Sequence, residues 1–388
     1  MKAMESTLLK ASRRYPDCTA EMESSLAMSY NVEEQIRTHQ TRETFLKELG
    51  GRTVPIPLHC LSMRLTAEYY ALKPEEREFP NKRKRQDPDL YHFVVLSDNI
   101  LASSVVVNST VSTAKEPEKI VFHVVTNSAN FPSMSMWFLS NPPSKATVHV
   151  EIADLRLLSG KLSGNTKKEI SADPRDISEL NHLLFYLPYI FPHLNKVVLL
   201  DHDVVVRKDL TPLWTMGIQG RVNGAVSTCD DERPPLFRNM DMFINFTDPI
   251  IADRFDALVC PWAFGMNVFD LQEWRHQNLT KVYHKYLRLG KDRPLWKVGG
   301  ILPIGLITFY GRTYDIDKKW HLLGLGYDSG VRQEVIEKAA VIHYNGNMKP
   351  WLAFGLEKYR HYWSKHVKYE HPFLQSCNIH DHYYKFRI

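Results

Sequence analysis

Residues 196 to 206 read KVVLLDHDVVV, an apolar run that two aspartates and one histidine interrupt. The valines and leucines before Asp201 predict a buried strand, because such residues favour the interior of a sheet. Asp201 and Asp203 then stand at the carboxyl edge of that sheet, where α/β proteins bind ligands. The stretch therefore predicts both a fold class and the place of a functional site.

The chain around this stretch alternates between short apolar runs and helical segments from Tyr91 onward. In order, the segments are YHFVVLSDN, NILASSVVVNST, KIVFHVVTNS, SMSMWFLSN and TVHVEIADL. This alternation predicts an α/β fold with a doubly wound, mostly parallel sheet. Polar residues that end an apolar run are the first site candidates, and Ser97-Asp98-Asn99 forms a second such group besides Asp201-His202-Asp203.

The first 88 residues are more polar than the rest of the chain and lack its short apolar runs. The stretch NVEEQIRTHQTRETFLKEL (31–49) predicts an amphipathic helix. It is followed by KPEEREFPNKRKRQDPD (73–89), a charged segment with prolines that predicts a linker. We therefore expect a helical N-terminal region with a charged linker over residues 1–88 and an α/β domain over residues 89–388.

Composition and missing motifs argue against several classes of protein. The apolar fraction of 44% and charged fraction of 24% are those of an ordinary globular protein, and the formal net charge of +5 favours anionic partners. No strand is followed by GxGxxG, GxxxxGK[ST] or GxSxG, which argues against dinucleotide-binding oxidoreductases, P-loop NTPases and serine hydrolases. A nucleic-acid-binding function would rest only on the net charge and KRKR at 82–85, without a binding module.

The sequence has no window of about 18 consecutive apolar residues and no apolar stretch of a signal peptide at its N-terminus. Its five cysteines, at positions 18, 60, 229, 260 and 377, show no CxxC pair and no zinc-ligand spacing. We expect most of them to be buried free thiols. The sequons at Asn108, Asn245 and Asn278 would matter only in a secretory compartment.

Two segments carry residue types that suit a metal-bound diphosphate. An extended Asp-x-Asp pair projects both carboxylates to one side, so Asp201 and Asp203 predict a site for one hard divalent cation. In HYNGNMKPW (343–351), His343 would complete that site, Gly346 would let backbone amides approach a phosphate, and Lys349 would neutralise diphosphate charge. Taken singly, each has a structural explanation as a strand-end histidine, a turn glycine or a solvated cation.

Two further segments supply weaker signals. In CPWAFGMNVFDLQEW (260–274), Gly265 permits close backbone approach and Asn267 offers an amide to a sugar hydroxyl. The glycines of WHLLGLGYDSG (320–330) suit a loop around a polar ligand, although alone they are a turn signal.

Together these segments resemble the plant galacturonosyltransferase branch of glycosyltransferase family 8, whose members are retaining enzymes with a GT-A fold. The resemblance covers nearly the whole chain. Its blocks are NVEEQ, PLHCLSMRLT, the strand with SDN, FHVVTNSANFPSMSMWF, LDHDVVVRKDLTPLW, WAFGMNVFDLQEW, LGLGYDSG and HYNGNMKPWL.

The resemblance implies a UDP-galacturonate donor held by Mn²⁺, from which galacturonic acid passes to the homogalacturonan of pectin. It also implies retention by front-face displacement, in which the departing phosphate guides the acceptor hydroxyl. By role, the matching positions are Asp201, Asp203 and His343 for the metal, Gly346 and Lys349 for the diphosphate, and Asp98 and Asn99 for the uridine edge. We also expect Gly265 to contribute to donor binding. The expected catalytic set is Asp201, Asp203, Lys349 and Asn267.

The sequence departs from the family pattern at four positions. His202 replaces the middle one of three aspartates, Leu184 an arginine, Tyr189 an acid and Asn127 an aspartate. In these four residues and in its tail HPFLQSCNIHD, the sequence most resembles one subgroup of the family. That subgroup is thought to act as the partner and Golgi anchor of a catalytic galacturonosyltransferase. A weakly active or inactive partner subunit in a hetero-oligomer is therefore the alternative function.

The family implies a Golgi protein at the lumenal face of the membrane. The membrane helix that usually anchors its members is missing from this sequence, so we expect association through a partner or through an anchor absent here. At the other end, KYRHYWSKHVKY (358–369) interleaves cations with aromatic residues. It predicts either a surface that stacks on the sugar rings of an anionic acceptor, or an amphipathic helix that packs its aromatic residues into the core.

Overall fold

The structure is a computed structural model that describes residues 54–153, 179–229 and 239–381. The helix expected at residues 31–49 and Cys18 lie outside the described residues. From Val54 onward the chain forms one compact unit.

A seven-stranded sheet forms the centre of this unit. Its strand order is β3 (Thr147–Ile152), β2 (Ile120–Thr126), β1 (Tyr91–Leu96), β4 (Lys196–Leu200), β7 (Met266–Asp270), β6 (Asn223–Ala225) and β8 (Thr313–Asp315). Strands β3, β2, β1 and β4 run parallel, β7 is antiparallel to both of its neighbours, and β6 and β8 are parallel. The prediction of a mostly parallel α/β sheet is confirmed.

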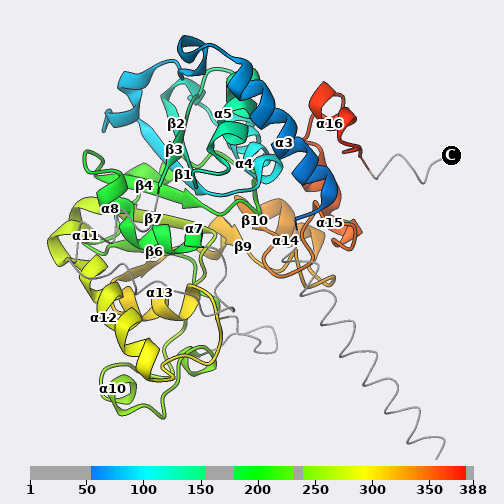
Figure 1. Cartoon of the computed structure of the whole chain (residues 1–388). Helices are drawn as coiled ribbons and strands as arrows, with labels where there is room; N and C mark the ends of the chain where they lie inside the picture. Colours follow the sequence, from blue (N-terminus) through cyan, green and yellow to red (C-terminus); the bar gives the residue numbers. More distant parts are fainter. Residues whose placement is uncertain (1–53, 154–178, 230–238, 382–388) are drawn as a thin grey trace, which may run out of the picture. The chain divides into compact units, whose positions relative to one another are not determined.

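Both faces of the sheet are covered, which is why most residues of its central strands are apolar. Along β1, Phe93 and Val95 enter one core cluster while Val94 and Leu96 enter the other, as the two-residue period of a strand requires. Helices α3 (Ile56–Ala71), α4 (Ile100–Thr113) and α5 (Phe131–Ser140) contribute to the first cluster. Figure 1 shows these three together, with α11 to α13 away from them across the strands.

The remaining helices are short, except for α12, which has 14 residues. The α-helices are α7 (Glu179–His182), α8 (Leu187–Ile190), α9 (Pro212–Thr215), α10 (Pro249–Ala252), α11 (Leu271–Gln277), α12 (Leu279–Asp292), α13 (Leu302–Thr308), α14 (Gln333–Lys338), α15 (Glu357–Ser364) and α16 (Pro372–Ser376). The 3₁₀ segments are η2 (Pro74–Arg77), η3 (Lys82–Gln86), η4 (Pro117–Lys119), η6 (Leu183–Tyr186), η7 (Met240–Met242) and η8 (Lys318–Trp320). A search of the described helices found none with the length and apolarity needed to cross a bilayer.

The stretch KVVLLDHDVVV is divided between two sheets. Strand β4 belongs to the large sheet, whereas β5 (Val204–Val206) joins a small sheet with β10 (Val341–His343) and β9 (His321–Leu322). Between β4 and β5 the chain turns, and the amide of Val204 donates to the carbonyl of Asp201 at 3.4 Å. The expected extended Asp-x-Asp was therefore wrong, because the chain must leave one sheet and enter the other at this point.

The segment before the sheet is packed rather than free. Arg85 of η3 donates to the buried Glu151 carboxylate of β3 at 3.0 Å. Helix α3 buries Leu61 and Leu65, and its Cys60 is bonded to Cys377 near the C-terminus. The described part of the N-terminal region, from Val54 onward, belongs to the same compact unit as the sheet.

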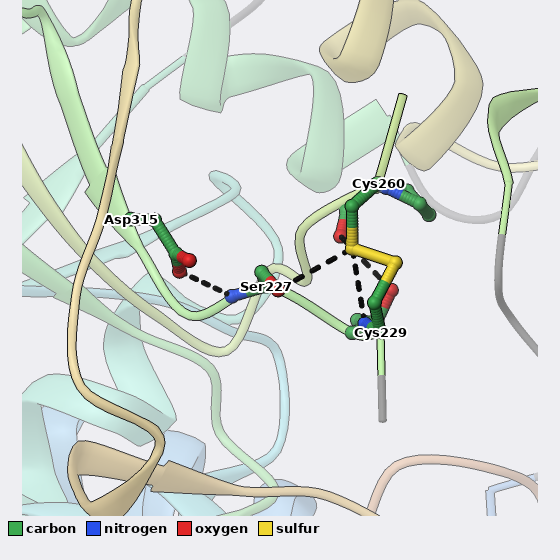
Figure 2. The surroundings of a disulfide bond; sticks show 6 residues. Ser227, Cys229, Cys260 and Asp315 are labelled. Atoms are coloured by element: carbon green, nitrogen blue, oxygen red, sulfur yellow. Dashed lines mark hydrogen bonds between the residues drawn. A yellow bond between two sulfur atoms is a disulfide. The ribbon is translucent and has the colours of Figure 1, made fainter. Parts of the chain in front are cut away.

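Four of the five cysteines form disulfides, so the expectation of free thiols was wrong. Cys60 pairs with Cys377 across 317 positions of sequence, and Cys229 pairs with Cys260. Figure 2 shows the second disulfide beside Ser227, whose amide donates to Asp315 at 3.0 Å. Spacing concealed these pairs, since residues far apart in sequence meet only after the chain has folded. Such bonds persist in oxidising compartments.

The C-terminal segment KYRHYWSKHVKY begins in helix α15, where Tyr359, Tyr362 and Trp363 are buried. The packing alternative is therefore confirmed for these three aromatic residues, and they offer no exposed ring for a sugar. Lys358, Lys365 and other cations of the segment stay exposed.

A buried chain of polar side chains crosses β1, β2 and β3. His92 Nδ1 lies 2.9 Å from His123 Nε2, and His123 Nδ1 lies 2.7 Å from a Glu151 carboxylate oxygen. Burial, reinforced by the charge of His123, lowers the pKa of both His92 and His149 from 6.5 to about 4. Both rings are therefore neutral in the folded protein at neutral pH.

This burial predicts an acid-sensitive fold. Below pH 6.5 the unfolded chain binds protons that folded His92 and His149 refuse until about pH 4, so stability is complete above pH 6.5 and is lost as pH falls. We expect the free energy of unfolding to fall by roughly 2 kcal/mol per histidine between pH 7.5 and pH 5, measured by guanidinium titration. His149→Gln should reduce this loss, whereas the exposed control His276→Gln should not; equal losses in both variants would contradict the assignment.

Candidate functional site

Three side chains that could hold a metal ion converge beyond the carboxyl end of β4. Asp201, Asp203 and His343 each offer a ligand atom, and these atoms all lie within 4.8 Å of one another. Asp201 follows β4 directly, Asp203 precedes β5, and His343 ends β10. The sequence predicted these three residues as one site, and the structure brings them together across 140 positions of sequence.

Backbone pairing fixes this convergence. Strand β10 is antiparallel to β5, with His343 opposite Val204, and the amide of Tyr344 donates to the carbonyl of Asp203 at 2.9 Å. The amide of Asp201 donates to the carbonyl of Gly265 at 3.0 Å, which ties the turn to the chain entering β7. The carboxylates are therefore positioned by the two sheets rather than by a flexible loop.

The two carboxyl groups differ in their electrostatic surroundings. Burial would raise the pKa of Asp203, but the charges of His343 and Lys349 outweigh it and hold that pKa well below its ordinary value. His343 Nε2 lies 2.9 Å from Asp203 Oδ1, and Lys349 Nζ donates to Asp203 Oδ2. Burial and the neighbouring charge of Asp203 raise the pKa of Asp201.

The donor set tests whether a divalent metal fits. Two carboxylates and one imidazole are ligands that Mn²⁺ and similar ions accept, and two neighbouring carboxylates gain from a shared cation. Asp203 and His343 are 6% and 4% exposed, so an ion bound by them would be partly shielded from water. The residues present therefore fit a divalent cation.

The segment that carries Lys349 is interlocked with the glycine-rich loop after β9. Gly324 donates its amide to the Asn345 side chain at 2.7 Å, and Met348 donates its amide to Gly326 at 3.0 Å. Gly346 has φ +98°, and a Cβ there would lie 2.9 Å from the carbonyl oxygen of Gly326. The sequence suggested that these glycines approach a ligand, and the structure shows that they let two backbone segments approach each other.

Gly265 makes room for the imidazole of His343. A Cβ on Gly265 would lie 2.3 Å from His343 Nδ1 and 2.9 Å from Cε1 of His321, and the residue has φ +122°. Only glycine adopts that conformation without strain. The close approach expected at Gly265 is therefore present, and its neighbours are two histidines.

The predicted uridine edge lies at the end of β1. Asp98 is exposed, and the Asn99 side-chain oxygen accepts the amide of Ala102 at 3.0 Å as the N-cap of α4. Since β1 and β4 are parallel neighbours, their carboxyl ends lie at the same edge of the sheet. Asp98 and Asn99 are thus on the same side of the sheet as the metal candidates.

Asn267 is placed differently from the other candidates. It is fully buried in β7, and its amide donates to the Asn223 side chain at 3.1 Å, inside the sheet. Its amide NH₂ is therefore engaged between two strands of the large sheet.

The positions that depart from the family pattern have local explanations. Leu184 is fully buried in the second core cluster. Asn127 accepts the amide of Asn130 at 2.9 Å in the turn before α5. His202 is half-buried, and its ring centre lies 5.6 Å from that of Trp351.

His321 is a neighbour of the site that the sequence reasoning missed. Its Nε2 lies 3.0 Å from His343 Nδ1, and burial lowers its pKa well below the ordinary value. The sequence marks His321 only as a single histidine in the apolar run WHLLGL, beside glycines that indicate a loop. Its partner is 22 positions away, a separation that no local pattern marks.

This arrangement suits the binding of an anion through a shared metal. The two carboxylates and His343 would hold the cation, and Lys349 adds a positive charge beside them. A nucleoside diphosphate fits this edge of the sheet: its phosphates would match the metal candidates and Lys349, and its base would match the polar residues at the end of β1.

Comparisons with known proteins agree with this geometry. The family model described as "Glycosyl transferase family 8" matches residues 60–355. Two similar proteins of Arabidopsis thaliana are probable galacturonosyltransferase 5 and probable galacturonosyltransferase 6, each 54% identical over 98% of this chain. The chain spans 62% and 64% of the length of these relatives.

Solved structures show the fold. The bifunctional glycosyltransferase WbbM has a TM-score of 0.54 at 17% identity, covering 76% of this chain and 52% of that one. An active-site mutant of LgtC has a TM-score of 0.52 at 18% identity, covering 71% of this chain and 95% of that one. With the sheet topology, these likenesses identify a GT-A fold, as the sequence predicted.

The contact of Gly265 predicts the effect of a single added methyl group. Gly265→Ala should displace the His343 ring, lower the affinity for Mn²⁺ at least tenfold by isothermal titration calorimetry, and reduce stability by about 1–3 kcal/mol. The control is Gly220→Ala, since Gly220 also has positive φ (+70°) but nothing within 4 Å of the added Cβ. Unchanged Mn²⁺ affinity in a folded Gly265→Ala variant would contradict the role of this glycine.

Proposed function

The chain belongs to glycosyltransferase family 8, and on that premise we propose that it transfers galacturonic acid from UDP-galacturonate to homogalacturonan. The observation that carries the proposal is the convergence of Asp201, Asp203 and His343 beside Lys349. The names of the similar Arabidopsis proteins supply the sugar, since they are called galacturonosyltransferases.

Asp201, Asp203 and His343 would hold Mn²⁺, for which their two carboxylates and one imidazole are suitable ligands. The ion would bind the diphosphate and stabilise the charge that develops on it as the sugar departs. Lys349, whose ammonium lies against Asp203, would add a second positive charge for the leaving group. The turn between β4 and β5 thus carries the part of the site that recognises the diphosphate.

At the end of β1, Asp98 would accept a hydrogen bond from the uracil ring of the donor. Asn99 engages its side-chain oxygen in capping α4, so its amide NH₂ is the group it would offer. These two residues would select a uridine nucleotide, whereas the metal ligands recognise any diphosphate.

We propose that transfer retains the anomeric configuration by front-face displacement. The bond between the sugar C1 and the diphosphate oxygen breaks, and its electron pair stays on UDP. The acceptor hydroxyl oxygen forms the new bond to C1 and gives its proton to the departing phosphate. The protein's part is to hold donor and acceptor in this orientation.

The alternative function, an inactive partner subunit, rests on Leu184, His202 and Asn127. Leu184 is uncharged and lies in the core, so it does not supply the cation that the family arginine would. The retained metal ligands and Lys349 favour the enzyme, while assembly with a second galacturonosyltransferase is compatible with either function. Activity of the isolated chain separates the two.

We place the protein at the lumenal face of the Golgi membrane. The disulfides Cys60–Cys377 and Cys229–Cys260 support an oxidising compartment. The family relationship supports the Golgi, where a pectin-synthesising enzyme would meet its acceptor.

The direct test supplies purified protein with UDP-galacturonate, Mn²⁺ and an oligogalacturonide, and follows chain length by mass spectrometry. We expect stepwise extension that Mn²⁺ removal abolishes and that Asp203→Ala lowers by roughly 100-fold or more, because that variant removes a metal ligand and the partner of Lys349. Asp253→Ala, at an exposed aspartate, is the matched control.

The same preparations are titrated with Mn²⁺ and UDP. Donor binding that depends on Mn²⁺ and disappears in Asp203→Ala supports the proposed site. A folded wild-type chain that neither extends the acceptor nor hydrolyses the donor would refute the enzyme function, and capture of a catalytic relative in a pull-down would then favour the partner subunit.

A lumenal location predicts glycosylation that the fold restricts. Asn278 is exposed between α11 and α12, whereas Asn108 is only half-exposed within α4 and its side-chain amide donates to the carbonyl of His366 at 3.2 Å. Peptide mass spectrometry of protein made in a secretory host should find a glycan on Asn278 and none on Asn108. A glycan on Asn108, or an unmodified Asn278, in the folded secreted protein would contradict this prediction.

A further inference from the structure

The small sheet places a second buried histidine behind the metal ligand His343. His321 begins β9, which pairs in parallel with β10, and its ring stacks on that of His343 with centres 5.1 Å apart and planes 20° apart. His321 is 3% exposed. Its Nε2 is 3.0 Å from His343 Nδ1, a hydrogen-bond distance.

The two nitrogens of His343 face different partners. Nε2 points to Asp203, at 2.9 Å, and is therefore the nitrogen on the side of the metal candidates. A neutral imidazole carries one proton, so a metal bound at Nε2 requires that proton on Nδ1. The acceptor that lies next to Nδ1 is Nε2 of His321.

We propose that His321 is a positioning residue of the metal site: its Nε2 accepts the Nδ1–H of His343 and so keeps the Nε2 lone pair of His343 directed at the metal. The inference rests on the metal site of the proposed function. It assigns to His321 the outer-ligand role that carboxylates and backbone carbonyls commonly have behind metal-bound histidines.

Packing alone does not account for a histidine at this position. His321 Nδ1 is buried without a hydrogen-bond partner among the described residues, and an unsatisfied buried polar atom is a cost that an apolar side chain would avoid. The imidazole pair also requires a glycine at 265, because a Cβ there would meet both rings. The fold therefore accepts two unfavourable features to keep His321 beside His343.

The test measures Mn²⁺ affinity of the full chain by calorimetry, in the absence of any sugar nucleotide. His321→Leu, which removes the acceptor, should weaken Mn²⁺ binding roughly 10- to 100-fold. His321→Gln places an amide near the position of Nε2 and should restore most of that affinity. Melting temperatures without metal identify variants that are folded, and His321→Phe replaces the leucine variant if the latter does not fold.

A matched control comes from another buried histidine in the same protein. His149 of β3 is 5% exposed, and its Nε2 also has no hydrogen-bond partner among the described residues. His149→Leu should change the melting temperature but leave Mn²⁺ affinity within about twofold of wild type. It separates an effect on the metal site from a general effect of losing a buried imidazole.

The outcomes are distinct. Weak Mn²⁺ binding in the leucine variant with recovery in the glutamine variant supports the inference. Wild-type affinity in folded His321→Leu overturns it, and so does equal weakening in both variants, which would assign the effect to packing. A wild type without Mn²⁺ affinity overturns it together with the metal site, whereas a wild type that binds Mn²⁺ but transfers no sugar refutes only the proposed reaction.

Discussion

The contact between Asp203 and His343 lies where the chain passes from the large sheet into the small one. Asp203 leaves the turn after β4, His343 ends β10, and their side chains meet at 2.9 Å in a buried environment. A buried carboxylate is costly without compensating charge, so His343 and Lys349 stabilise the turn that carries Asp203, whatever they do in the proposed reaction. The contact that stabilises the buried carboxylate also brings together the oxygen and nitrogen atoms of Asp201, Asp203 and His343 that could bind a metal.

The antiparallel strand β7 supports this contact from the other side. Its entry at Gly265 accepts the amide of Asp201 and leaves room for His343 and His321. The strands of a parallel sheet commonly end in loops. Here the antiparallel strand β7 instead places hydrogen-bonded backbone beside the carboxyl end of β4. Metal ligands held in this way need little rearrangement on binding, which is how an active site gains precise geometry.

The periphery of the unit is fastened covalently. Cys60 and Cys377 join the first described helix to the end of the described chain, and Cys229 and Cys260 close a loop whose base extends the β6–β7 pair. The second of these lies beside Ser227, whose amide donates to Asp315 at the end of β8 (Figure 2). Both bonds restrain segments that a small set of sheet hydrogen bonds would hold less firmly.

The sequence by itself determined the strands β1 to β4 and their mostly parallel arrangement, because both follow from local periodicity. It also determined Asp201, Asp203 and His343 as candidate metal ligands, because they stand in recognisable motifs. Tertiary structure decided what local pattern does not encode: the turn that separates β4 from β5, the two disulfides, the engagement of Asn267 between strands, and the pairing of His321 with His343. Each of these depends on which distant segment lies alongside, and that is fixed only when burial of apolar faces and completion of backbone hydrogen bonds select one arrangement of the whole chain.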